Sequence, residues 1–366
     1  MKQQPYTNII YHAEVITPLF MSGTDRYEYE LREQSIKGVL RYWARVYLYS
    51  VYDKDKARDL EFKIFGGISG NEAYKSLISL RILNRNIDEI SYYEITRDDP
   101  WDRRSTRFGI SYLAYGLSYR KNTRSAIKPG STFDLKIIID NIRAQNLNIK
   151  IDIKDLIHKS ISLASFIGGF GSRNRRGFGT IHFQEAGDIE SLIQFLNKIK
   201  IRKTKYDAYF DLIPNLGNLK IYESKETFDS WVEAMEEIGS ELSLFRSRYQ
   251  PDYRNVKYIL STSSPKDLEI EKAWFGLPLN YYFRSLNGKK GNIYFYKKDD
   301  KTRLASPLII RILKGEKYKV ILSLFDLNLS KYNLYLVSKY VESKLSFGSE
   351  NATKKFIETI DYKEIW

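Results

Sequence analysis

Residues 167–181 read Ile-Gly-Gly-Phe-Gly-Ser-Arg-Asn-Arg-Arg-Gly-Phe-Gly-Thr-Ile, so that five glycines surround three arginines in one short stretch. Glycine has no Cβ, so it adopts positive φ and lets backbone amides come close to a ligand. Arginine carries a permanent charge on a forked set of donors that fits phosphate geometry. We therefore predict a loop that lies against a polyanion, with contacts from Gly168, Gly169, Gly171, Arg173, Arg175, Arg176, Gly177 and Gly179.

The segments on either side place this glycine–arginine loop on a folded scaffold. Asp152 to Ile167 has apolar residues at helical spacing, and Phe178 to Phe183 is typical of a strand. A mononucleotide site would need G-x-x-x-x-G-K-[ST] or G-x-G-x-x-G after a strand, and neither the spacing nor the element order is present. A glycine-rich turn whose arginines are merely solvated remains the alternative.

Composition favours a nucleic-acid partner. The formal net charge is +14, and 14% of the 366 residues are aromatic, including 29 tyrosines. Positive charge attracts nucleic acid or an acidic surface, and aromatic rings stack on unpaired bases. Many of these tyrosines are expected to be half-buried strand residues, so the two signals together indicate single-stranded nucleic acid.

The same composition excludes several other classes. The chain has no cysteine and three scattered histidines (His12, His158 and His182), so we expect no disulfide, thiolate site or metal cluster, and no cofactor. No apolar run approaches the roughly 18 residues of a membrane span, and no signal-peptide core follows Met1. We expect a cytoplasmic protein without a membrane partner.

A second basic group is predicted on the helix that Ser35 begins. Its apolar stripe runs from Ile36 to Tyr47, and Lys37, Arg41 and Arg45 recur every four residues on another face. No acid follows at salt-bridging spacing until Asp53. The row is therefore expected to be uncompensated and to contact phosphates, with a solvated basic face as the alternative.

Residues 85–128 show no clean period and mix cations with aromatic residues. We predict a long insertion with a short hairpin. Its cations and aromatic residues are of the types that bind single-stranded RNA. The candidate contacts in it are Arg103, Arg104 and Arg107.

Without that insertion, the first half has the order strand, helix, strand, strand, helix, strand. The expected strands are Asn8 to Phe20, Lys75 to Leu83, Thr132 to Asp140 and Phe178 to Phe183, and Phe62 to Gly70 is expected to break regular structure. This is the order of a ferredoxin-like (βαββαβ, RRM-like) unit, with the glycine-rich loop before its last strand. We predict an α+β first domain over residues 1–200.

The second half, residues 201–366, is predicted to be a degenerate unit of the same type. We expect a long helix from Thr227 to Arg248 and a hairpin from Leu308 to Phe325. Tyr332 to Leu345 and Asn351 to Ile360 are expected to be helical.

Five motifs occur in one order across nearly the whole chain. They are Ile16-Thr17-Pro18-Leu19-Phe20, Ser35-Ile36-Lys37-Gly38-Val39-Leu40-Arg41-Tyr42-Trp43, the glycine–arginine loop, Phe275-Gly276-Leu277-Pro278-Leu279 and Arg303-Leu304-Ala305-Ser306-Pro307-Leu308. With these motifs the chain resembles the first subunits of the Cmr complex, the type III-B CRISPR effector, within the RAMP superfamily.

The resemblance implies tandem ferredoxin-like domains that bind guide (CRISPR) RNA toward its 3′ part and cap a filament of other RAMP subunits in antiviral defence. Target single-stranded RNA is a further candidate partner. Such subunits are regarded as non-catalytic, because target cleavage belongs to the repeated backbone subunit. The family's RNA contacts carry over to Lys37, Arg41, Arg45, Arg173, Arg175, Arg176 and Arg303.

Two other functions stay open at this point. Some RAMP relatives are metal-independent endoribonucleases that process guide RNA, and one of the three histidines with a tyrosine would have to supply the acid–base chemistry. A scaffold that needs no polyanion is the other alternative, and it predicts that RNA has no effect on assembly.

Overall fold

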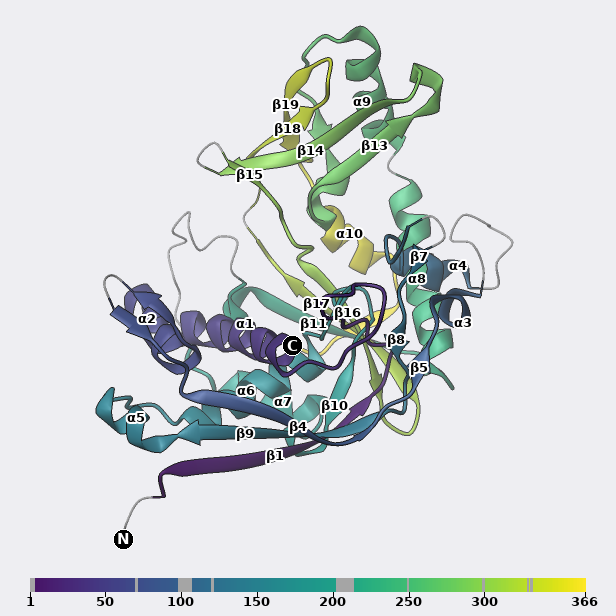
Figure 1. Cartoon of the computed structure of the whole chain (residues 1–366). Helices are drawn as coiled ribbons and strands as arrows, with labels where there is room; N and C mark the ends of the chain where they lie inside the picture. The colour runs from purple at the N-terminus through teal and green to yellow at the C-terminus, as the bar shows by residue number, and fades with distance from the viewer. Residues whose placement is uncertain are drawn as a thin grey trace.

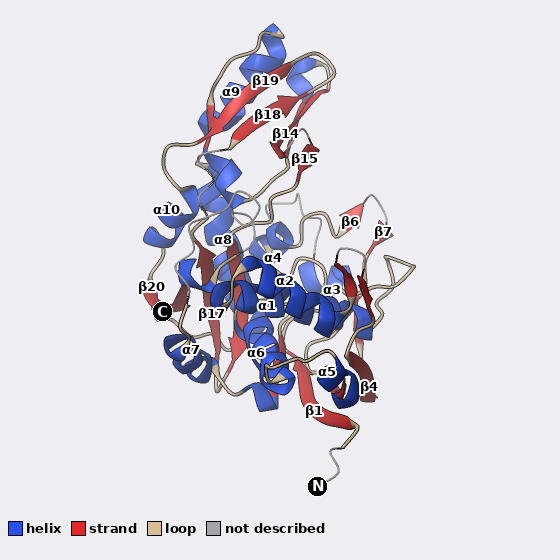
Figure 2. Ribbon diagram, turned by 90° about the vertical axis from the view of Figure 1, so that its left-hand side faces the viewer, coloured by secondary structure: helices blue, strands red, loops and turns tan. Residues whose placement is uncertain are grey.

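The computed structural model describes residues 4–69, 72–97, 107–119, 122–201, 214–248, 250–297, 300–327, 329 and 332–366. In this part of the chain, two four-stranded antiparallel sheets lie side by side and a larger sheet stands away from them as an outer lobe (Figure 1). Figure 2 shows the same separation from the side. None of the described helices offers the long apolar run that crossing a bilayer requires.

The first four-stranded sheet has the order β10-β1-β9-β4, and helices α1 and α6 pack together on one of its faces (Figure 1). Strand β9 alternates buried and less buried residues, as expected of a sheet covered on one side. Numbered within the unit, the strand order is 4-1-3-2, so the predicted ferredoxin-like unit is confirmed. Its elements are β1 (Tyr6–Val15), α1 (Glu33–Val51), β4 (Ile78–Asn86), β9 (Thr132–Asp140), α6 (Ile153–Phe166) and β10 (Ile181–Phe183).

The second sheet repeats this topology. Read from the other edge, its order is β20-β11-β17-β16, which is again 4-1-3-2 when the strands are numbered within the unit. The predicted hairpin is confirmed as β16 and β17, whose inner positions are almost continuously buried. The elements are β11 (Leu219–Ser224), α8 (Trp231–Ser247), β16 (Leu308–Lys314), β17 (Tyr318–Phe325), α10 (Ala352–Glu358) and β20 (Tyr362–Glu364).

Two insertions into the second unit build the outer lobe. They supply α9 (Gln250–Thr262), β12 (Glu269–Ile270), β13 (Leu279–Phe283), β14 (Lys289–Lys297), β15 (Asp300–Thr302), β18 (Asn333–Val337) and β19 (Glu342–Phe347). The helix predicted over Tyr332 to Leu345 is therefore wrong. Leu334 and Leu336 are buried while their neighbours are more exposed, which is the two-residue period of a strand.

Apart from three 3-10 turns of the second half, the remaining elements belong to the first unit. The break predicted from Phe62 to Gly70 is wrong in its first part, because α2 continues to Phe65, and the predicted hairpin in the insertion is present as β6 and β7. The boundary predicted at residue 200 borders residues 202–213, outside the described part, so it stays a prediction. The elements are α2 (Lys54–Phe65), β2 (Gly67–Ser69), β3 (Glu72–Tyr74), β5 (Glu89–Ile90), α3 (Tyr92–Thr96), α4 (Phe108–Leu113), β6 (Ser118–Tyr119), β7 (Asn122–Thr123), β8 (Ala126–Ile127), α5 (Asn141–Asn146), α7 (Ile189–Lys198) and the 3-10 turns η1 (Gln184–Ala186), η2 (Leu216–Asn218), η3 (Glu271–Phe275) and η4 (Arg284–Leu286).

Helix α4 of the insertion crosses α8 of the second unit at very short range. A Cβ on Gly109 would lie 2.1 Å from the carbonyl oxygen of Glu236, and one on Gly239 would lie 2.3 Å from the carbonyl oxygen of Gly109. The Glu236 carboxylate also accepts hydrogen bonds from the first amides of α4, at 2.7 Å from Gly109 and 3.0 Å from Ile110. A carboxylate at a helix N-terminus stabilises the helix, so this contact fixes α4 on the second unit.

Candidate nucleic-acid interface

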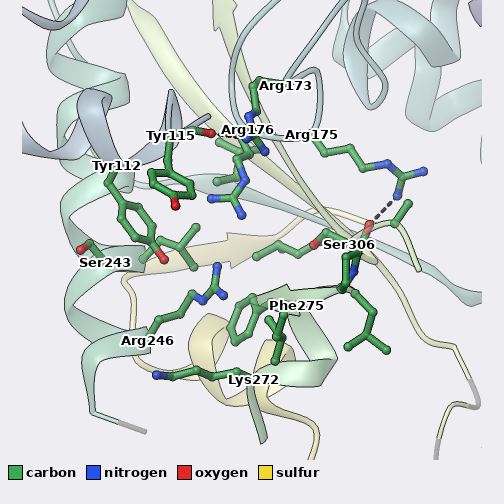
Figure 3. Close-up of a pocket in the computed structure, with 18 of the residues that line it drawn as sticks. Tyr112, Tyr115, Arg173, Arg175, Arg176, Ser243, Arg246, Lys272, Phe275 and Ser306 are labelled. Carbon is green, nitrogen blue, oxygen red and sulfur yellow. Dashed lines mark hydrogen bonds between the residues drawn. The ribbon is translucent and has the colours of Figure 1, made fainter. Parts of the chain in front are cut away.

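A cavity of about 870 Å³ opens where the two units and the outer lobe meet. Its walls come from the glycine–arginine loop, α4, α8, η3 and the start of β16, so elements distant in sequence converge on it (Figure 3). We call it the cationic cavity, because five of its lining side chains are Arg173, Arg175, Arg176, Arg246 and Lys272.

No aspartate or glutamate is among the described residues that line the cationic cavity. Burial lowers the pKa of Arg173 and of Lys272, and burial together with the charge of Arg246 lowers the pKa of Arg176 to about 10. Because desolvation and mutual repulsion both oppose the charged forms, an anion in the cavity would relieve them.

The three predicted loop arginines lie together at the cavity, but each makes different contacts with the rest of the protein. Arg173 donates to the carbonyl oxygen of Tyr115, and Arg175 donates to the carbonyl oxygen of Ser306 and, at 3.0 Å, to the Tyr42 hydroxyl (Figure 3). The Arg176 guanidinium lies 5.9 Å from the centre of the Tyr112 ring. Fixed guanidinium groups lose little entropy when they bind phosphate, so the site is preorganised.

The loop glycines are needed for close packing within the protein. A Cβ on Gly179, where φ is +68°, would lie 1.9 Å from the carbonyl oxygen of Phe170, and one on Gly168 would lie 2.3 Å from Trp43 Nε1. The amides of Gly177 and Gly179 already bond to the carbonyl oxygens of Ile310 and Pro18, both at 3.0 Å. The idea that these two amides face a ligand is therefore wrong, and RNA contact by the glycines stays a prediction.

The loop is also tied to the second unit by a buried cation that the sequence did not single out. Arg311 of β16 is fully buried and donates to the carbonyl oxygens of Phe178, Ser165 and Gly179 at 3.3–3.5 Å. Its Nη1 lies 2.5 Å from the position that a Cβ on Gly169 would take. Burial lowers the pKa of Arg311 to about 9. The Arg311 side chain therefore fixes the loop to strand β16 of the second unit.

The basic row of α1 is arranged differently from the prediction. Glu61 of α2, with 2% of its side chain exposed, accepts hydrogen bonds from Arg41 Nε and Arg45 Nε, both at 2.7 Å. Lys37 Nζ donates to Ser76 Oγ at 2.8 Å and to the carbonyl oxygen of Ile78 at 3.0 Å. Arg41 and Arg45 therefore share one carboxylate, contrary to the sequence argument, while Lys37 bonds to neutral acceptors. RNA contact by Lys37, Arg41 and Arg45 stays a prediction, and the resemblance to the Cmr subunits is now its support.

A smaller cavity of about 270 Å³ lies between α1 and the loop. Asn174 and Arg175 line both cavities, so the two cavities are neighbours. On the α1 side it is lined by Gly38, an exposed helical glycine whose Cβ would meet no atom within 4 Å. A ligand that left the cationic cavity past Arg175 would reach α1 at this point.

The remaining predicted residues lie outside the cationic cavity or outside the described residues. Arg107 donates to the carbonyl oxygens of Glu94 and Ile95 at the end of α3, at 2.7 and 2.8 Å. Arg303 is exposed and directly precedes Leu304, which lines the cavity. Arg103 and Arg104 lie outside the described part of the chain.

Sequence reasoning missed Arg246 and Lys272, the two cations that the second half contributes. Arg246 lies one residue before the end of α8, 5.2 Å from the Phe275 ring, and Lys272 lies in η3. The one sequence signal for Lys272 was its position, three residues before the motif that begins at Phe275. No group of metal-ligating side chains was found among the described residues.

Residues 12–182 match the family model of the RAMP superfamily. This stretch, just under half of the chain, is therefore similar to RAMP domains. The curated CRISPR system Cmr subunit Cmr1-2 of Pyrococcus furiosus is 26% identical over 187 residues, which cover 48% of this chain and 94% of that protein. The expected resemblance to the first subunits of the Cmr complex is thus confirmed.

Solved structures resemble this chain over nearly its whole length. The crystal structure of Cmr1 from Pyrococcus furiosus in its apo form covers 98% of this chain and 99% of that one, with 16% identity and a TM-score of 0.56. A chain from the cryo-EM structure of type III-B Cmr-β bound to cognate target RNA covers 98% of each chain, with 14% identity and a TM-score of 0.47. The first of these likenesses shows that the fold is shared.

Proposed function

We propose that this chain is a non-catalytic RNA-binding subunit of a type III-B CRISPR (Cmr) ribonucleoprotein effector in the cytoplasm. It binds guide RNA toward its 3′ part and caps the filament of RAMP subunits. The observation that carries the proposal is the cationic cavity, in which five cations from both units face a space whose described lining holds no carboxylate.

The chemistry of the cavity favours RNA over a small anion. Tyr112, Tyr115 and Phe275 line the same cavity as the cations, so bases could stack where phosphates are neutralised. A volume of about 870 Å³ exceeds what a single phosphate needs. Contacts of this kind tolerate any base, so we expect weak sequence preference.

A role in assembly without catalysis is favoured by the position of the histidines. His158 is in α6 and stacks on Tyr11, and His182 is half-buried on β10. His12 pairs with Glu185 on the surface. None of the three lines the cationic cavity, so RNA bound there would lie away from these groups.

The test is binding of labelled single-stranded RNA to the purified protein across a salt series, beside the variant in which Arg173, Arg175 and Arg176 are changed to alanine. We expect roughly 10- to 100-fold weaker binding, about 1 kcal/mol for each residue. Each lost phosphate contact should lower the salt slope by about 0.7–0.9. Unchanged affinity with an intact fold would remove the cavity from the proposal.

The same samples test the enzymatic alternative. RNA that shortens with wild-type protein, and remains whole after one histidine is changed to alanine, would establish guide processing. Assembly with other Cmr subunits that is the same with and without RNA would favour the scaffold.

A further inference from the structure

The outer lobe has one covered face and one open face. Buried residues of β13, β14, β18 and β19 face α9, whose Val256, Ile259 and Leu260 are fully buried. The alternate positions point to the other side, since neighbouring strand residues face opposite ways. Their described members are Asn280, Tyr282, Lys290, Asn292, Tyr294, Asn333, Tyr335, Val337, Glu342, Lys344 and Ser346. We call this set the open face.

Tyrosines and lysines stand beside one another on the open face. Tyr294 of β14 pairs directly with Tyr335 of β18, and Tyr335 pairs with Lys344 of β19. Side chains at such paired positions have Cβ atoms about 4.5–5.5 Å apart. On the next strand, Tyr282 is 56% exposed, and Lys290 Nζ lies 5.9 Å from the centre of its ring.

The open face continues from the cationic cavity. Asn280 belongs to the open face and also lines the cavity. Tyr294 follows Ile293, whose partner Leu279 lines the cavity as well. Arg303 directly follows Thr302, which pairs with Phe295 at the end of β15, and directly precedes Leu304, which lines the cavity. The predicted contact Arg303 thus lies where the cavity meets the open face.

We propose that the open face is a stacking surface for single-stranded RNA that extends from the cationic cavity. The proposal rests on the proposed function, because the strand must first occupy the cavity. Lys290 and Lys344 outnumber Glu342, the one carboxylate among the described open-face residues, and the exposed Arg303 adjoins the cavity next to β15, so the surface attracts a polyanion. Three tyrosine rings on one uncovered sheet face can stack on successive bases.

The experiment measures fluorescence anisotropy of two labelled oligouridylates, one short enough to fill the cavity alone and one long enough to reach the outer lobe. The variant is Tyr294→Ala with Tyr335→Ala. We expect roughly 10-fold or greater loss of affinity for the long RNA, from two stacking contacts, and little change for the short one. Tyr294→Phe with Tyr335→Phe keeps both rings and should bind the long RNA like the wild type.

A matched control lies on the opposite side of the same lobe. Tyr258 of α9 is 50% exposed but is absent from the open face, so Tyr258→Ala should bind both RNAs like the wild type. Because Tyr294 and Tyr335 are half-buried, a second measurement uses only wild-type protein. Cross-linking of RNA that contains 4-thiouridine should label peptides of β14 or β18.

The outcomes separate the two proposals. Equal binding of the long RNA by a folded alanine variant, with no cross-link to β14 or β18, overturns the open face and leaves the cavity untouched. Loss of binding by the triple-arginine variant for both lengths supports the cavity. Loss of another Cmr subunit by the alanine variant, with RNA binding unchanged, would assign the open face to a protein neighbour and overturn the proposal.

Discussion

Two groups of cations in the first unit look equivalent in sequence and differ in the folded chain. The row Lys37, Arg41 and Arg45 on α1 is held by the buried carboxylate of Glu61, Ser76 Oγ and a backbone carbonyl. The loop group Arg173, Arg175 and Arg176 contacts two backbone carbonyls, a tyrosine hydroxyl and a tyrosine ring, and it faces a cavity without a carboxylate in its described lining.

The two groups differ in how their charges affect the stability of the protein without RNA. A buried carboxylate requires its cations, so removing them leaves an uncompensated charge and destabilises the fold. Cations that repel one another in a cavity already oppose folding, and a bound anion relieves that cost. We therefore expect the α1 row to contribute mainly stability and the loop group mainly RNA affinity.

Changing Arg41 and Arg45 together to alanine should have the largest effect. Glu61, with 2% of its side chain exposed, would lose both of its cationic partners. We expect a loss of about 3–5 kcal/mol in the free energy of unfolding, with RNA affinity of the remaining folded protein changed little. Urea denaturation and anisotropy on the same samples would measure both quantities. A large loss of affinity with normal stability would instead make the α1 row part of the RNA site.

For Arg246→Met we expect the opposite pattern, in which stability is kept and RNA affinity falls. Burial and, after it, the charge of Arg246 lower the pKa of Arg176 to about 10, and Arg246 lies over the Phe275 ring. Methionine keeps apolar packing, so stability should stay the same or rise by up to about 1 kcal/mol. RNA affinity should fall roughly 10-fold, about 1.4 kcal/mol. Arg254→Met, at an exposed position of α9 outside the cavity, is the matched control and should leave affinity unchanged.

Glu61→Gln sharpens the comparison through its pH dependence. Burial raises the pKa of Glu61, but hydrogen bonds from Arg45 and Arg41 outweigh it, so the pKa lies below its ordinary value of 4.5. The ionised carboxylate therefore contributes stability above about pH 4.5, and this contribution is lost as the pH falls through the folded-state pKa. At neutral pH the variant should be less stable by about 1–3 kcal/mol.

That difference should shrink as the pH falls, because protonated Glu61 and glutamine are both neutral. Denaturation at a series of pH values from neutral to below pH 4.5 would measure it. A difference that stays constant over this range would mean that the charge of Glu61 contributes nothing.

The sequence predicted those parts of the fold and site that depend on local pattern. Strand β9 and the β16–β17 hairpin follow from alternation and a turn, and the loop arginines follow from a short motif. The partner of Arg41 could not be predicted, because Glu61 lies 20 residues away on another helix. Arg311 was hidden in an apolar strand, and its acceptors are at least 132 residues distant. Which charges are neutralised is decided by tertiary packing.

Gly38 offers the smallest and most selective change. No atom lies within 4 Å of the position of its Cβ, so Gly38→Ala should stabilise α1 by about 1 kcal/mol through helix propensity alone. RNA affinity should not change, because a methyl group barely enters the smaller cavity. Gly38→Leu extends further into the space that Arg175 shares with the cationic cavity, and should lower affinity roughly 3-fold, about 0.7 kcal/mol. Thermal denaturation and anisotropy would measure both effects. If Gly38→Leu binds RNA like Gly38→Ala, the strand does not reach α1, and the two groups of cations divide stability and binding completely.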